Sequence, residues 1–295
     1  MTRIALATAA AARDLDEDLP PLAAALRAAG AEPAVIDWDD GSTLWSHYDL
    51  VVLRSTWDYT QRLGPFLRWI DEVSAATALL NPAEVVRWNT DKHYLAHLAQ
   101  AGIAVVPSFF VEPGDDPSEA LARFRRDARG EFVVKPSIGA GSRDAQRYPA
   151  DESAGAIQHM RRLLDANRSV LLQPYLGRID DYGETALIFL DGAFSHAIRK
   201  GPLLRRGEGP TRALFAAEHI TPREPSAEEI ALSERTLAAI PFPGPLLYAR
   251  VDLIHDDEGK PCVLELELSE PSLFFAHAEC SADRFAAAIL KRARA

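Results

Sequence analysis

The first 80 residues alternate short apolar strands with amphipathic helices. RIALATA, AEPAVIDW and YDLVVLRST are typical of buried strands, and helices are expected around residues 19–31 and 64–76. Strands that alternate with helices build βαβ units and an open parallel sheet. We therefore predict a Rossmann-like α/β domain at residues 1–88. The turn after the first strand lacks the G-x-G-x-x-G fingerprint, which argues against a nicotinamide-dependent dehydrogenase.

The rest of the chain mixes helices and strands in an order typical of α+β units. A strand containing FVVKP lies between two predicted helices, and Asp191-Gly192 marks a tight hairpin turn further on. Residues 202–224 are polar and basic and indicate a loop. We expect a central lid subdomain with a linker helix at 89–172 and a C-terminal antiparallel-sheet domain at 173–295.

Composition and charge exclude several classes of protein. Hydrophobic residues make up 47% of the 295 and charged residues 25%, as in ordinary globular chains. The formal charge of −11 repels a polyphosphate backbone, so we expect no nucleic-acid partner. No apolar run approaches the roughly 20 residues of a membrane helix, and the N-terminus lacks the apolar core of a signal peptide. The two cysteines are too few for a disulfide framework, which fits a cytoplasmic protein.

The stretch EFVVKPSIGAGSRDAQRY, residues 131–148, places a lysine at the end of a buried strand and then opens into small residues. After Lys135 come Ser137, Gly139, Gly141 and Ser142. Such residues let backbone N–H groups point toward an anion. The pattern favours a phosphate-binding loop, and this segment alone leaves a plain turn as the alternative.

Two strands near the C-terminus carry paired polar residues. Arg250 and Asp252 in YARVDLI are two positions apart, as are Glu265 and Glu267 in VLELEL, so each pair lies on one face of its strand. If the strands pair, three carboxylates crowd together and would suit Mg²⁺ shared with substrate phosphates. An alternating strand with one solvated face is the competing interpretation.

The order of these elements resembles the ATP-grasp superfamily from about Asn89 to Glu270. The series begins with the lysine of WNTDKHYL, followed by FVVKP, the Gly/Ser loop and LLQPYL. It continues with Glu184 and ends with the Arg-x-Asp and Glu-x-Glu strands. The resemblance implies an α/β protein with the ATP-grasp fold. It also implies a ligase that uses ATP and Mg²⁺ to activate a small-molecule carboxylate as an acylphosphate, which a nitrogen nucleophile then attacks.

The resemblance gives each matching position a role. Lys92 and Lys135 would hold the ATP phosphates, and Arg250 would act with Lys135 in catalysis by steadying the transferring phosphoryl group. Glu184 would bind the ribose, although an exposed glutamate at the start of a strand is the alternative. The other nucleotide contacts implied are Ser137, Gly139, Gly141, Ser142, Gln173, Pro174, Tyr175 and Leu176. The implied magnesium ligands are Asp252, Glu265 and Glu267.

The end of the chain departs from the common family pattern. Many ATP-grasp enzymes have Glu-x-Asn and then a Pro-Gly turn, whereas this chain has ELE and then EPS, with Glu267 in place of the asparagine. Glu267 can still bind a cation, so ATP binding is still expected, while the position of the acceptor is left open.

Three longer segments narrow the resemblance further. RSTWDY, RWNTDKHYL and ELELSEPSLFF together resemble a branch similar to glutathione synthetase, and within it the cyclo-ligases that close O-ureido-D-serine to D-cycloserine. That likeness implies attack by a nitrogen of the same molecule. A ligase that joins a carboxylate to a separate amine, and a nucleotide-binding regulator without ligase activity, are the alternatives. A homodimer is the default expectation for such a chain.

A segment of the N-terminal domain suits a small zwitterionic substrate. LRSTWDYT, residues 53–60, lies at the carboxyl end of a predicted parallel strand, where open α/β sheets bind their ligands. It offers a guanidinium, hydroxyls, aromatic rings and a carboxylate. For this segment the alternative is a capped turn with a packed tryptophan. Basic residues of the later hairpin could also contact the substrate, and for them the alternative is an exposed basic turn. The predicted substrate residues are Arg54, Ser55, Thr56, Trp57, Asp58, Tyr59, Arg199 and Lys200.

Overall fold

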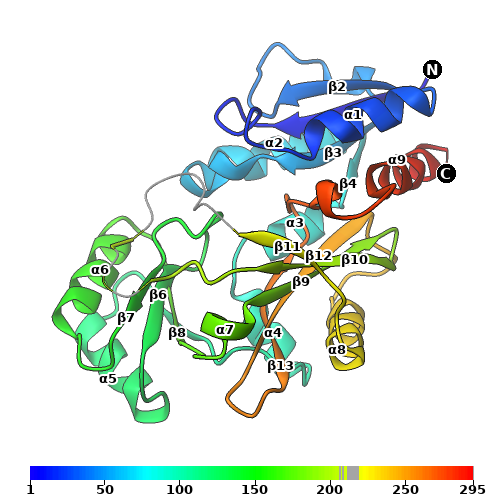
Figure 1. The fold of residues 1–295 in the computed structure, drawn as a ribbon. Helices are drawn as coiled ribbons and strands as arrows, with labels where there is room; N and C mark the ends of the chain where they lie inside the picture. The colour runs from blue at the N-terminus through cyan, green and yellow to red at the C-terminus, as the bar shows by residue number, and fades with distance from the viewer. Residues whose placement is uncertain (206, 208, 211–218, 295) are drawn as a thin grey trace.

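The computed structural model describes residues 1–294 apart from 206, 208 and 211–218. Three sheets follow one another along the chain, two with four strands and a last one with five (Figure 1). The first sheet is parallel and the other two are antiparallel, which confirms the expected order. Among the helices of the described residues, none has the length and apolar character needed to cross a membrane.

The N-terminal sheet has the strand order β2-β1-β3-β4. Every residue of β3 is buried, as expected for a central parallel strand covered on both faces. The strands are β1 (Arg3–Thr8), β2 (Glu32–Asp37), β3 (Leu50–Ser55) and β4 (Ala78–Leu80). Their helices are α1 (Leu19–Ala28), η1 (Trp45–His47), η2 (Trp57–Gln61) and α2 (Leu63–Ala76), of which η1 and η2 are short 3-10 helices.

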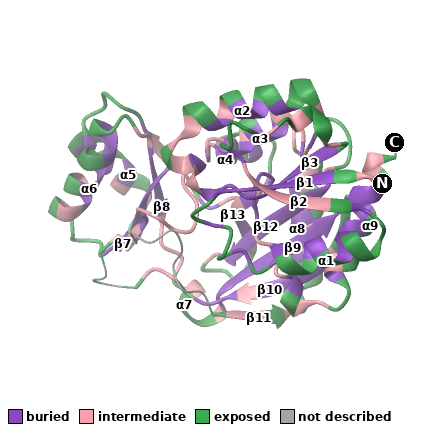
Figure 2. Ribbon diagram, turned by 90° about the horizontal axis from the view of Figure 1, so that it is seen from above, coloured by how far each residue is buried: buried purple, intermediate pink, exposed green. Residues whose placement is uncertain are grey.

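The middle sheet has the strand order β5-β8-β6-β7, and Lys135 lies near the end of β6 as predicted. Side chains of its two helices pack with Phe132 and Val134 in one apolar cluster. The elements are β5 (Phe109–Val111), α5 (Pro117–Asp127), β6 (Phe132–Pro136), β7 (Gln146–Tyr148), α6 (Ala154–Asp165) and β8 (Val170–Pro174). Figures 1 and 2 show this unit standing to one side of the other two sheets.

The last sheet has the strand order β11-β10-β9-β12-β13. Asp191 and Gly192 have φ angles of 50° and 80°, which confirms the tight turn between β9 and β10. The elements are α7 (Ile179–Tyr182), β9 (Glu184–Leu190), β10 (Ala193–Lys200), β11 (Ile220–Arg223), α8 (Ala227–Ala238), β12 (Tyr248–His255), β13 (Pro261–Glu267), η3 (Phe275–His277) and α9 (Ser281–Ala293). The expected loop over 202–224 is wrong at its end, because Ile220–Arg223 pair with the edge of β10. Residues 206, 208 and 211–218 of that loop lie outside the described residues.

The connections between the sheets share their cores. The expected single linker helix is two helices, α3 (Ala83–Asn89) and α4 (Tyr94–Gln100), and both pack on the last sheet. The C-terminal helix α9 packs against α1 in an apolar cluster that joins the first and last sheets (Figure 1). The domain division at 1–88, 89–172 and 173–295 stays a prediction.

Candidate active site

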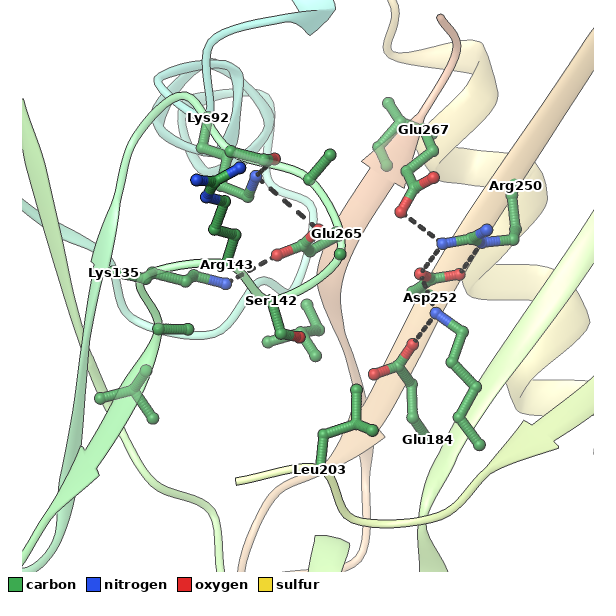
Figure 3. Close-up of a pocket in the computed structure, with 18 of the residues that line it drawn as sticks. Lys92, Lys135, Ser142, Arg143, Glu184, Leu203, Arg250, Asp252, Glu265 and Glu267 are labelled. Carbon is green, nitrogen blue, oxygen red and sulfur yellow. Dashed lines mark hydrogen bonds and ion pairs between the residues drawn. The ribbon is translucent and has the colours of Figure 1, made fainter. Parts of the chain in front are cut away.

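One pocket lies where the three sheets meet, and most of the predicted site residues line it. The residues that line it and were predicted to contact the nucleotide are Lys92, Lys135, Gly139, Gly141, Ser142, Gln173, Pro174, Tyr175, Leu176 and Glu184. The other predicted residues that line it are Trp57, Tyr59, Lys200, Arg250, Asp252, Glu265 and Glu267. Segments far apart in the sequence thus meet around a single space (Figure 3).

The two predicted phosphate lysines converge on one carboxylate. Lys135 Nζ lies 2.8 Å from Glu265 Oε1, and Lys92 Nζ lies 3.8 Å from Glu265 Oε2 (Figure 3). Lys92 also donates a hydrogen bond of 2.8 Å to the Gly139 carbonyl of the glycine loop. Burial would raise the pKa of Glu265, but the charges of Lys135 and Lys92 outweigh burial and lower it to about 2. Glu265 is therefore ionised at neutral pH.

A second cluster of charges surrounds Asp252. Lys200 Nζ lies 2.6 Å from Asp252 Oδ2 and also pairs with Glu184. Arg250 Nε lies 2.8 Å from Asp252 Oδ1, and Arg250 Nη2 pairs with Glu267 (Figure 3). Burial acts to raise the pKa of Asp252, but the charges of Arg250 and Lys200 hold it well below the usual range. Burial raises the pKa of Glu267, and Arg250 opposes that rise.

The strand register explains why these acids meet. β12 and β13 pair antiparallel, with Arg250 opposite Glu267 and Asp252 opposite Glu265, so the predicted pairing of the two strands is confirmed. In the part of the chain that the structure describes, no three His, Cys, Asp or Glu side chains form a group ready to hold a metal ion. The carboxylates face lysine and arginine instead. Their oxygens suit Mg²⁺ in kind, and could bind it once the lysines turn toward another anion.

The glycine loop between β6 and β7 is shaped by left-handed backbone. Gly141 and Ser142 have φ angles of 60° and 58°, a conformation that favours glycine. Asp144 anchors the loop through Arg162 and Arg168 at 3.0 and 2.8 Å. The loop therefore presents Gly139 to Ser142 to the pocket.

Ser137 is the one predicted nucleotide contact that lies away from the pocket, and its role stays a prediction. The residue is fully buried and does not line the pocket. Its backbone N–H donates to the Ser169 carbonyl, and its own carbonyl accepts from the backbone N–H of Lys92. Ser137 joins the loop to its neighbours because the chain still runs through the interior there.

Only the aromatic members of the RSTWDY segment reach the pocket. Trp57 and Tyr59 line it, and Trp57 Nε1 donates a hydrogen bond of 2.9 Å to the Glu270 carbonyl. Arg54, Ser55, Thr56 and Asp58 do not line the pocket, so their contact with substrate stays a prediction.

The four residues are engaged elsewhere. Arg54 is fully buried, with Nη2 3.6 Å from Asp18, and Ser55 Oγ shares a hydrogen bond of 2.7 Å with Thr8. Thr56 is fully buried too, and Asp58 accepts hydrogen bonds from Trp38 and Arg62. The reason is that β3 is buried along its length, so the side chains of this segment that line the pocket come from η2.

The two basic residues of the hairpin point in different directions. Arg199 does not line the pocket, because it donates to the carbonyls of Tyr182 and Asp181 at 2.7 and 3.0 Å, and its contact with substrate stays a prediction. Lys200 lies in the pocket between two acids. Successive residues of a strand face opposite ways, so only one of the pair could enter.

The sequence prediction missed pocket residues on the segment after β13. Glu270, Ser272 and Phe274 line the pocket, and the Ser272 carbonyl accepts a hydrogen bond of 3.0 Å from Arg250 Nη1. Arg143 of the glycine loop also lines it. The signal available for Glu270 was its place directly after the Glu-x-Glu strand.

Comparison with known proteins gives one family repeatedly. The family model for the N-terminal domain of D-cycloserine synthetase DcsG matches residues 4–81. The cycloserine biosynthesis protein DcsG of Streptomyces lavendulae is 41% identical over an alignment of 296 positions that covers 98% of each chain. A crystal structure of D-cycloserine synthetase DcsG has 40% identity and a TM-score of 0.93, with 99% of each chain covered.

More distant solved structures share the fold. The ATP-grasp ligase PsnB, in complex with a phosphomimetic variant of its minimal precursor, Mg and ADP, has 20% identity and a TM-score of 0.68, with 99% of each chain covered. The D-alanine–D-alanine ligase from Bacillus anthracis complexed with ATP has 15% identity and a TM-score of 0.68, covering 100% of this chain and 98% of the ligase. These likenesses confirm the fold that the order of motifs predicts.

Proposed function

Because the chain belongs to the DcsG family of ATP-grasp ligases, and is thus an ATP-dependent ligase that forms a C–N bond, we propose that it closes O-ureido-D-serine to D-cycloserine. The observation that carries the proposal is the pocket itself. It brings two lysines and a glycine loop on one side together with Arg250 and three acids on the other, and adds Trp57 and Tyr59 as a wall.

The nucleotide would lie along the middle sheet. Pro174 to Leu176 leave β8 and line the pocket, while Gln173 is held by a hydrogen bond of 3.0 Å from its Nε2 to Ser108 Oγ. Lys92, Lys135 and the loop residues Gly139, Gly141 and Ser142 would hold the phosphates. Glu184 lines the same pocket and would bind the ribose hydroxyls.

Asp252, Glu265 and Glu267 would hold Mg²⁺ once phosphates draw the lysines away. When bound, the ion neutralises charge on the phosphates. Lys135 is the residue best placed for this exchange, because its ammonium group sits on Glu265 and would move to the γ-phosphate. Arg250 stays beside Asp252 and would steady the transferring phosphoryl group.

The proposed reaction has two steps. A substrate carboxylate oxygen attacks the γ-phosphorus, the bond to the β–γ bridging oxygen breaks, and ADP leaves. The oxygen-bound nitrogen of the same molecule then attacks the acylphosphate carbon and phosphate leaves, which closes the ring. Because D-cycloserine lacks the ureido carbonyl and its amino group, one water molecule must also hydrolyse the bond between that nitrogen and the ureido carbon, which releases carbon dioxide and ammonia. The residues of the pocket position the reactants and exclude water from the acylphosphate.

A cytoplasmic location and a homodimer are part of this proposal. We also expect no nucleic-acid partner, which the net charge of −11 supports. A small carboxylate is then the partner that matters most. The pocket offers Arg250 and the aromatic wall for it.

The test is ADP release with Mg·ATP, comparing O-ureido-D-serine with single amino acids and with pairs that could form dipeptides. We expect release with O-ureido-D-serine and a product of cycloserine mass. Asp252→Asn removes a proposed Mg²⁺ ligand and Lys135→Ala removes a cation that would hold the phosphates, so each should lower kcat by about 100-fold or more. The exposed Asp257→Asn and Lys260→Ala are the matched controls and should keep wild-type rates.

Other outcomes separate the alternatives. Turnover on an amino-acid pair, with none on O-ureido-D-serine, would replace ring closure by intermolecular ligation. Nucleotide binding without ADP release on any carboxylate would favour the regulator. Full activity in both pocket variants would contradict the assigned roles of Asp252 and Lys135.

A further inference from the structure

Glu270 is a buried acid of the pocket to which the reaction above gives no role. It lies three residues after Glu267, on the segment that leaves β13, and is 9% exposed. It lines the same pocket as Trp57 and Tyr59. An acid this enclosed needs a physical reason to be there.

Glu270 differs from the other acids of the pocket in its partners. Each of the other four pairs with a lysine or arginine, the pairs being Glu184–Lys200, Asp252–Lys200, Glu265–Lys135 and Glu267–Arg250. Within the described residues, no Lys, Arg or His side chain forms an ion pair with Glu270. Lys92 and Arg250 act on it from a distance, and the Tyr59 hydroxyl is its hydrogen-bond partner.

The missing cation leaves Glu270 in an unfavourable setting. Burial, reinforced by the charge of Glu267, raises the pKa of Glu270 to about 8. An ionised carboxylate without a nearby positive charge is costly to bury, and either a proton or a cation bound in the pocket removes that cost. The described part of the chain gives each of the other four acids of the pocket a lysine or arginine partner and gives Glu270 none of these.

The backbone around Glu270 is fixed, so its side chain is held at the pocket. The Glu270 carbonyl accepts a hydrogen bond from Trp57 Nε1 at 2.9 Å, and the Ser269 carbonyl accepts one from the Tyr248 hydroxyl at 2.7 Å. Further along, the Asp18 carboxylate accepts hydrogen bonds from the backbone N–H groups of Leu273, Phe274 and Phe275. Such a preorganised acid can bind a ligand without first being ordered.

We propose that Glu270 binds the ammonium group of the substrate and so selects amino acids over carboxylic acids that lack the α-amine. The inference rests on the proposed function, since it takes the substrate carboxylate to lie at the phosphates. An ammonium group beside Glu270 would give the fifth acid of the pocket an ion pair, as the other four already have. The aromatic rings of Trp57 and Tyr59 line the same space and would attract the same cation.

The test compares an amino acid with its deamino partner in direct binding. O-ureido-D-serine and 3-(ureidooxy)propanoate share the carboxylate and the nitrogens of the ureido group, and differ in the α-ammonium group. The affinity of each is measured by calorimetry with Mg·ADP present. We expect the wild type to bind the amino compound about 100-fold more tightly than the deamino compound. Glu270→Gln should abolish that preference and leave the affinity for the deamino compound unchanged.

Two further variants keep the result interpretable. Glu279→Gln changes an exposed acid nearby in the chain and should retain the preference. Glu270→Asp should retain part of the preference, because it keeps the charge on a shorter side chain, and it provides a second measurement if the glutamine variant folds poorly.

Equal weakening of both compounds in Glu270→Gln would overturn the assignment, since it would mean that Glu270 only shapes the pocket. Equal binding of both compounds by the wild type would overturn it as well. ADP release judges the proposed function separately. Release that is equally fast with and without the α-amine keeps the ligase and rejects this role of Glu270, while no release with any carboxylate rejects the ligase itself.

Discussion

Single residues of the pocket are arranged so that charges cancel before any ligand binds. Lys200 illustrates this, since its one ammonium group serves both Glu184 and Asp252. Buried ion pairs add little net stability, because desolvation offsets most of their attraction. The ion pairs are better explained by ligand binding, because the acids can bind a metal ion and the lysines and arginine can bind phosphates. Function therefore explains these residues better than folding does.

His159 of α6 gives a prediction at the residue scale that concerns stability alone. It is 6% exposed and shares a hydrogen bond of 3.1 Å with the Tyr148 hydroxyl. Burial, with the nearby charge of Arg162, lowers the pKa of His159 from its usual 6.5 to about 4. The unfolded chain takes up a proton below pH 6.5 and the folded chain does not, so His159 should reduce stability by about 2 kcal/mol between pH 7.5 and 5.

Urea unfolding at both pH values tests this. His159→Gln should lose less stability than the wild type on acidification, by roughly that amount. The exposed His47→Gln serves as the control and should keep the wild-type slope. An unchanged slope in His159→Gln would mean that the buried ring does not govern acid sensitivity.

At the scale of elements, the segment after β13 depends on the N-terminal domain for its shape. The Asp18 carboxylate lies 3.6 Å from Arg54 and accepts three backbone hydrogen bonds from residues 273–275. Arg54 is thus linked to this segment through Asp18. The same segment carries Glu270 and Ser272 into the pocket.

Asp18→Asn should therefore act on both stability and substrate binding. The amide replaces an acceptor by a donor that faces N–H groups, and it leaves Arg54 buried with less negative charge, so we expect a loss of about 3 kcal/mol. The KM for the carboxylate should rise more than the KM for ATP, because the segment lines the pocket next to the acceptor. Asp14→Asn, an exposed change four residues earlier, is the control. A loss of stability with both KM values unchanged would limit Asp18 to a structural role.

Elements with strong local patterns could be predicted from sequence, and those set by distant contacts could not. The Arg-x-Asp and Glu-x-Glu strands and the lysine of β6 were predictable because alternation and turn residues act locally. The pairing of β11 with an edge strand, and the enclosure of Arg54, depend on packing between units. The lysine pairs on Glu265 and Asp252 also depend on long-range geometry, so sequence showed which charges are present but not which ones meet.

The whole molecule surrounds its pocket with segments from all three sheets, including Trp57, Lys135 and Asp252. A ligand that binds there ties the units together, so it should stabilise the chain as a whole. Mg·ADP at 100 times its Kd should add about 2.7 kcal/mol and raise Tm by several degrees. Lys135→Ala should keep most of the ligand-free stability, since Lys92 still lies near Glu265, but should show a much smaller shift at the same nucleotide concentration. Thermal unfolding with and without EDTA measures this, with Lys260→Ala as control. A shift in Lys135→Ala equal to that of the wild type, or one that EDTA leaves unchanged, would show that nucleotide binds without the lysine or the metal ion proposed for this pocket.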